Sequence, residues 1–113
     1  MKRLTKASFR NEILNLEKDE YQLKNNSVIK FFVDRCDDCN IMDPLFKSLE
    51  TDLSSVDFYE MKIGSDLEVA EKFNIEILPT FLIIRKDGEF LTLTGTMPKI
   101  ILQTKITQFF QND

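Results

Sequence analysis

The 113-residue sequence contains no histidine and no tryptophan. Without histidine, the chain cannot use the Cys–His or Ser–His arrangements of nucleophilic catalysis, and it cannot build a metal site that needs an imidazole ligand. Ten phenylalanines supply most of the aromatic side chains. These absences narrow the possible chemistry, and the phenylalanines predict a Phe-rich core.

Long apolar runs and a strong charge excess are also missing. No segment is apolar enough over a sufficient length to span a membrane, and the basic start at residues 1–6 lacks the apolar stretch of a signal peptide. The net charge of −4 argues against nucleic acid as a main partner. We therefore expect a cytoplasmic protein without membrane or nucleic-acid partners, folded as a single domain over residues 1–113.

Cysteine is scarce, but its placement is informative. The only two cysteines lie in the run Cys36-Asp37-Asp38-Cys39, which follows an apolar segment and precedes a segment with helical periodicity. A C-x-x-C pair at the start of a helix is typical of a dithiol–disulfide redox centre, because the helix N-terminus stabilises a thiolate. The second thiol, one helical turn away, is placed to release a mixed disulfide.

The remaining periodicity predicts an α/β fold. Helices and strands alternate, and the Asp87-Gly88 pair indicates a terminal β-hairpin. Gly64, Ser65 and Asp66 mark the end of one predicted strand. The predicted helices cover residues 8–23, a segment after the cysteines that contains Pro44, residues 67–73 and a last helix capped by Thr96; the predicted strands cover residues 28–33, 56–63, 80–85 and 90–94, with a short additional strand near 2–5.

These features together resemble the thioredoxin family over nearly the whole chain. The resemblance rests on the C-x-x-C run, on Pro44 within the following helix and on the segment Ile77-Leu78-Pro79-Thr80 before the hairpin. It implies a thioredoxin fold, with a mixed central sheet of four to five strands flanked by helices on both faces. It also implies a monomeric protein-disulfide reductase without a bound cofactor. Its partners would be disulfide-containing proteins and a thioredoxin reductase or similar electron donor.

The resemblance also assigns roles to individual residues. Cys36 would be the attacking thiolate, and Cys39, the more buried of the two, would be the resolving thiol. Pro79 would be a cis-proline packed against the cysteines, which exposes the backbone of Leu78 to a substrate segment. No metal site is expected.

Three departures from the family pattern are expected to tune the site. Arg35 stands where the family usually has tryptophan, and Asp37 and Asp38 replace the usual Gly-Pro. Lys30 occupies the position of the family's buried acid, and Glu60 the position of that acid's usual lysine partner. The resemblance therefore predicts a buried ion pair of reversed charge, Lys30–Glu60; the alternative is that Lys30 reaches solvent at the sheet end and Glu60 lies on the surface.

Other interpretations of the cysteines remain open. They could form a purely structural disulfide, or half of a zinc site shared by two chains, and Asp37 and Asp38 could simply be favourable residues for a first helical turn. The fold could also serve as a redox-dependent interaction module that binds one partner and has little general reductase activity. A broad disulfide-reduction assay distinguishes this module from a reductase.

Overall fold

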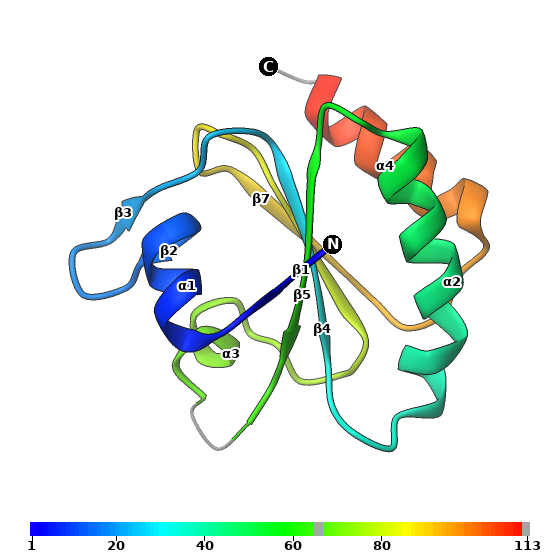
Figure 1. Cartoon of the computed structure of the whole chain (residues 1–113), viewed down its shortest axis with the longest axis horizontal. Coiled ribbons are helices and arrows are strands. Elements are labelled where there is room, and N and C mark those ends of the chain that lie inside the picture. The colour runs from blue at the N-terminus through cyan, green and yellow to red at the C-terminus, as the bar shows by residue number, and fades with distance from the viewer. Residues whose placement is uncertain (65–66, 112–113) are drawn as a thin grey trace.

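The computed structural model describes residues 1–64 and 67–111, which form a five-stranded sheet between two pairs of helices (Figure 1). The strand order is β1-β5-β4-β6-β7, where β1, β5 and β4 are parallel and β6 and β7 are antiparallel to their neighbours. The strands are β1 (Lys2–Leu4), β4 (Ser27–Phe32), β5 (Asp57–Lys62), β6 (Thr80–Ile84) and β7 (Phe90–Thr94). The predicted mixed sheet is therefore confirmed, including its short first strand.

The helices divide between the two faces of the sheet. They are α1 (Lys6–Glu12), α2 (Asp37–Asp52), α3 (Glu68–Lys72) and α4 (Lys99–Gln111). Figure 1 shows α1 and α3 on one side of the sheet and α2 and α4 on the other. Each face has its own buried cluster, one around Phe9, Phe31 and Phe73 and the other around Phe46 and Phe81. The core is Phe-rich, as the composition predicts.

The first helix is shorter than its apolar periodicity predicts. It ends at Glu12, and the chain then forms a small hairpin of β2 (Leu14–Asn15) and β3 (Glu20–Tyr21) instead of continuing as a helix to residue 23. The Asn15 side chain accepts hydrogen bonds from the backbone of Glu17 and Lys18. This local turn competes with helical hydrogen bonding, so it ends the helix despite suitable apolar spacing downstream.

The predicted cap of the last helix is also wrong. The last helix begins at Lys99, directly after Pro98, so Thr96 does not cap it; the residue before a proline is disfavoured in helical conformation, which delays the start. Ser65 and Asp66, which we expect to end a strand, lie outside the described residues.

The hairpin turn between β6 and β7 gives a stability prediction. Gly88 has φ +95°, and a Cβ there would lie 2.9 Å from the Tyr21 ring. We expect Gly88→Ala to lower the free energy of unfolding by about 1–3 kcal/mol, through backbone strain and ring displacement. Gly95→Ala is the matched control: φ there is +86°, but nothing lies within 4 Å of the added Cβ. Denaturant midpoints should show the larger loss at Gly88, and equal losses would rule out the Tyr21 contact.

Candidate active site

The two cysteines lie where strand β4 passes into helix α2. Cys36 is the N-cap residue of α2, and its Sγ accepts a hydrogen bond from the Cys39 backbone N–H at 3.1 Å. The two side chains form a disulfide, with their Cα atoms 5.2 Å apart. Cys36 is half-buried, while Cys39 is 2% exposed. One sulfur is therefore accessible to a partner and the other is shielded by the fold.

The residue before Cys36 sets the entry of the chain into the helix. Arg35 has φ +57°, in the left-handed region that is uncommon for residues other than glycine. Its side chain is exposed, so the position offers a cation at the surface beside the accessible sulfur. The neighbouring Asp34 forms an ion pair with Lys62, at the end of β5.

Asp37 and Asp38 are exposed residues in the first turn of α2. Their carboxylates are close to the N-cap sulfur along the chain. Their negative charge offsets the stabilisation that the positive end of the helix dipole gives to a thiolate. At high dielectric, each carboxylate disfavours a neighbouring thiolate by about half to one kcal/mol. The acidic turn therefore favours the disulfide over the dithiol.

This electrostatic argument predicts a change in reduction potential. Changing both Asp37 and Asp38 to asparagine should raise the potential of the cysteine pair by roughly 20–40 mV, since removing the negative charges stabilises the reduced form. Equilibration against a glutathione buffer of known composition measures it. Asp52→Asn, at the opposite end of α2, is the control and should leave the potential unchanged. A lower potential in the double variant would contradict the argument.

Pro79 is a buried residue at the same end of the sheet as the cysteines. The Leu78–Pro79 peptide bond is cis, as the resemblance implies. Thr80 follows directly and pairs in register with Phe31 of β4, close to the strand end that leads to Cys36. Leu78 itself is half-buried. The structure thus brings Leu78, Pro79 and the cysteines to one edge of the molecule.

Lys30 is buried, but its ion-pair partner differs from the predicted one. The residue is 1% exposed, and its Nζ donates a hydrogen bond to the Asp43 carboxylate of α2. Glu60 pairs instead with Arg3, with 3.1 Å between Arg3 Nη2 and Glu60 Oε1. The predicted Lys30–Glu60 ion pair is therefore wrong, and the alternative of a solvent-reaching Lys30 is wrong as well.

The topology of the sheet explains why the observed ion pairs differ from the predicted one. Lys30 and Glu60 are register neighbours on β4 and β5. However, the edge strand β1 places Arg3 opposite Glu60, and helix α2 covers β4 and supplies Asp43. Asp43 is not predicted from the sequence as the partner of Lys30. The available signal is its position four residues after Cys39, which places both on the same side of the helix.

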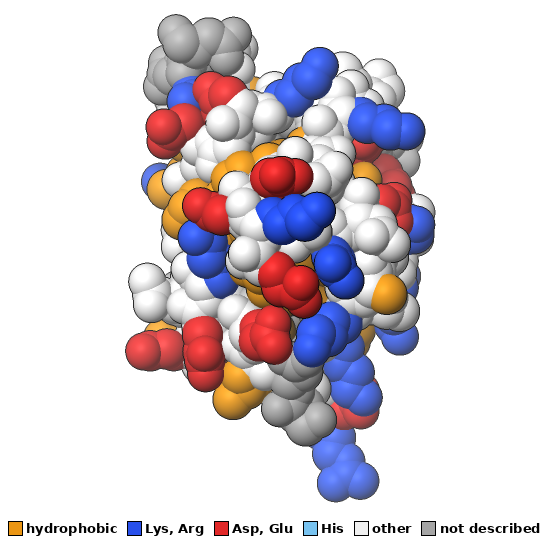
Figure 2. Space-filling model, turned by 90° about the vertical axis from the view of Figure 1, so that its left-hand side faces the viewer, with side chains coloured by type: hydrophobic (Ala, Val, Ile, Leu, Met, Phe, Trp, Pro, Cys, Tyr) orange, Lys and Arg blue, Asp and Glu red, His pale blue; other side chains and the backbone are white. Residues whose placement is uncertain are grey.

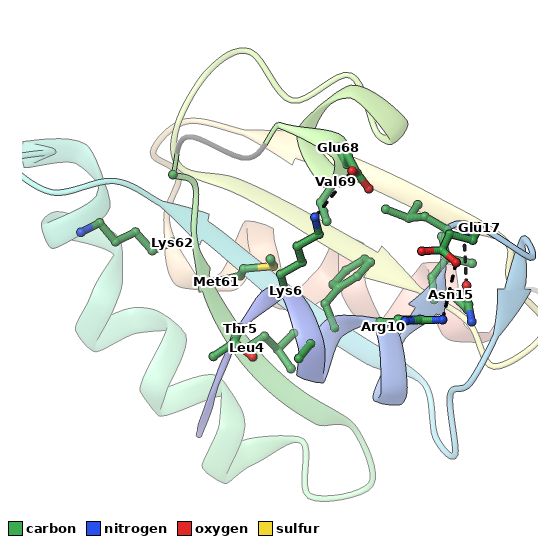
Figure 3. A pocket seen from close by; sticks show the side chains of 15 residues that line it. Leu4, Thr5, Lys6, Arg10, Asn15, Glu17, Met61, Lys62, Glu68 and Val69 are labelled. Carbon is green, nitrogen blue, oxygen red and sulfur yellow. Dashed lines mark hydrogen bonds and ion pairs between the residues drawn. The ribbon is translucent and has the colours of Figure 1, made fainter.

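A separate pocket of about 570 Å³ opens on the face covered by α1 and α3, and neither cysteine lines it. Figure 2 shows this face with interleaved acidic and basic side chains. Figure 3 shows two ion pairs across the pocket, Lys6–Glu68 and Arg10–Glu17, at 3.6 Å each. Its charges are paired within the chain and neither sulfur lines it, so this pocket is separate from the cysteine site.

Comparisons with known proteins agree with this geometry. The family model described as Thioredoxin matches residues 1–108. A thioredoxin of Mycoplasma genitalium is 28% identical over 103 residues, which cover 89% of this chain and 97% of that protein. A thioredoxin of Borreliella burgdorferi is 24% identical, with 95% of each chain covered.

A solved structure supports the fold independently. It comes from work on the thiol-resolving mechanism of a yeast mitochondrial 1-Cys peroxiredoxin via glutathione/thioredoxin systems. Its chain aligns with a TM-score of 0.72 and 23% identity, over 96% of this chain and 94% of its own length. In the part of the chain that the structure describes, no helix is long and apolar enough to cross a membrane.

Proposed function

This chain belongs to the thioredoxin family, and we propose that it is a protein-disulfide reductase that acts by thiol–disulfide exchange through Cys36 and Cys39. The single observation that carries the proposal is the Cys36–Cys39 disulfide at the N-terminus of α2. The unequal burial of the two cysteines supports an order in which Cys36 reacts first, because only a partly accessible sulfur can contact a disulfide on another protein.

In the proposed cycle, the Cys36 thiolate attacks one sulfur of the substrate disulfide. The substrate's disulfide bond breaks, one substrate thiolate leaves, and a mixed disulfide joins Cys36 to the other substrate sulfur. Cys39 then attacks Cys36 Sγ, which releases the second substrate thiolate and forms the Cys36–Cys39 disulfide. The substrate has gained two electrons, and a thioredoxin reductase or a similar donor restores the dithiol.

The surroundings of the sulfurs suggest how a substrate would be held. We assign the backbone of Leu78, next to the buried Pro79, to pairing with an extended substrate segment. Arg35, Asp37 and Asp38 are exposed around the N-cap, so they would select among substrates by charge. The two carboxylates would repel acidic segments and attract basic ones.

The same charges favour one alternative function. With Arg35 at a position where the family usually has tryptophan, the contact surface is charged, and the protein could be a redox-dependent module dedicated to one partner. We place either activity in the cytoplasm, where a reducing environment keeps such a pair cycling, and expect the protein to act as a monomer.

A turnover assay tests the proposal. The purified protein is supplied with electrons by a thioredoxin reductase, or by dithiothreitol if the reductase does not accept it, and is offered several unrelated disulfide-containing proteins. A reductase should turn over repeatedly on most of them, with rates that vary with substrate charge. Loss of turnover on all but one partner would favour the interaction module, and stoichiometric reaction without turnover on any substrate would contradict the proposal.

A further inference from the structure

In the reduced protein, Cys39 would be a buried thiol that has to become charged during the reaction. It is 2% exposed, and burial disfavours a thiolate because the charge loses its hydration. Only the thiolate attacks a disulfide, so the resolving step requires Cys39 to lose its proton within the fold. A positive charge close to Cys39 would offset this desolvation.

Lys30 supplies a positive charge in the right part of the molecule. Its Nζ donates to Asp43, which follows Cys39 by four residues in α2, so the two side chains are neighbours on one side of the helix, with Cβ atoms roughly 5–6 Å apart. The same Nζ lies 5.7 Å from the ring centroid of Phe32, the last residue of β4. These two contacts place the ammonium beneath the first turns of α2, where Cys39 lies.

The other charges around this point are more exposed or already paired. Among the described residues, Lys30 is the only charged residue that is buried. Its antiparallel register neighbour on β6 is Phe81, which carries no charge. The charged groups on the neighbouring elements are Asp37, Asp38, Asp43, Lys47, Glu50 and Asp52 on α2, Asp34 and Arg35 before it, Asp57, Glu60 and Lys62 on β5, and Lys2 and Arg3 on β1.

We propose that Lys30 is a positioning residue for the resolving step, whose ammonium, held by Asp43, stabilises the Cys39 thiolate. The proposal rests on the proposed function for the order in which the cysteines act. When Cys39 loses its proton to solvent, its thiolate attacks Cys36 Sγ and expels the substrate thiolate, which takes up a proton. Asp43, whose side chain is 39% exposed, accepts a hydrogen bond from the Lys30 ammonium and holds it directed toward the helix.

Single-turnover kinetics with 2,2′-dithiodipyridine separate the two steps. Attack by Cys36 releases one pyridine-2-thione, and attack by Cys39 on the mixed disulfide releases a second, so each step has its own absorbance phase. The reagent is neutral, so surface charge has little effect on its approach. Since it needs neither a protein substrate nor an electron donor, failure of the proposed reductase activity would leave this measurement intact.

The decisive variant is Lys30→Met, which keeps the length and apolar stem of the side chain and removes the charge. We expect the second phase to slow by about fivefold or more and the first phase to change less than about twofold, since the lost thiolate fraction outweighs the gain in intrinsic nucleophilicity. Lys99→Met is the control. It removes a cation that lies 2.7 Å from Asp52 at the other end of α2, and both phases should stay unchanged.

A spectroscopic titration distinguishes an electrostatic role from a structural one. In Cys36→Ser, the thiolate absorbance near 240 nm reports the ionisation of Cys39 alone. Adding Lys30→Met should move the midpoint to higher pH. An unmoved midpoint, an unchanged second phase or equal slowing of both phases would overturn the proposal. So would slowing of the second phase by Asp43→Asn with no effect of Lys30→Met, which would make Asp43 the proton acceptor.

Discussion

Replacing Cys36 with serine should reduce disulfide turnover to the uncatalysed background, whereas replacing Cys39 with serine should leave one attack intact. The reason is the division of labour between an accessible and a buried sulfur: Cys36 is half-buried at the N-cap, and Cys39 is 2% exposed. Without Cys39 the first exchange still occurs, but the mixed disulfide cannot be resolved. Cys39→Ser should therefore accumulate a covalent complex with its substrate.

Mass spectrometry and non-reducing electrophoresis measure this difference directly. A Cys39→Ser sample treated with an oxidised protein substrate should shift by the mass of that substrate, and dithiothreitol should reverse the shift. The Cys36→Ser sample is the matched control, since it also has one cysteine but should form little adduct. Adducts that form readily through Cys39 in the Cys36→Ser variant would show that the assigned order of the two cysteines is wrong.

The sequence predicts most of the sheet because its strands carry strong local signals. The apolar run before Cys36 becomes β4, and the Asp87-Gly88 turn joins β6 to β7. The terminal hairpin follows from turn chemistry alone, since Gly88 takes a positive φ there. These elements depend on neighbouring residues in the chain, so a single sequence is enough to place them.

The wrong predictions concern features that the local sequence does not decide. They depend on competition between two local structures or on residues that are distant in the sequence. The segment after α1 has apolar residues at helical spacing, but the Asn15 side chain bonds to the backbone and diverts the chain into the β2–β3 hairpin. The partner of Lys30 is decided by which element lies across from it. Register does place Lys30 beside Glu60, yet the flanking Arg3 and the overlying Asp43 take the two ion pairs.

The Lys30–Asp43 pair leads to a second large effect, on stability. Asp43→Ala should lower the free energy of unfolding by about 3 kcal/mol, because it leaves the ammonium of a 1%-exposed lysine without its counter-charge. Lys30→Met should change it by less than about 1 kcal/mol, since a flexible apolar side chain fills the same space and Asp43 retains access to solvent. The two partners of one ion pair should therefore respond very unequally.

Denaturant unfolding of both variants measures this asymmetry. The comparison requires that the slope of the unfolding free energy against denaturant concentration is the same in both. Lys62→Met is the control, since Lys62 and Asp34 form an ion pair whose side chains are 48% and 71% exposed; losing an exposed pair should change stability by less than about 0.5 kcal/mol. If Asp43→Ala is as mild as Lys62→Met, the lysine is not held in a low-dielectric site by that carboxylate. If Lys30→Met is the costlier change, the charge itself contributes to the stability of the fold. The asymmetry in the expected direction would show that the chain tolerates the absence of the buried cation but not its isolation.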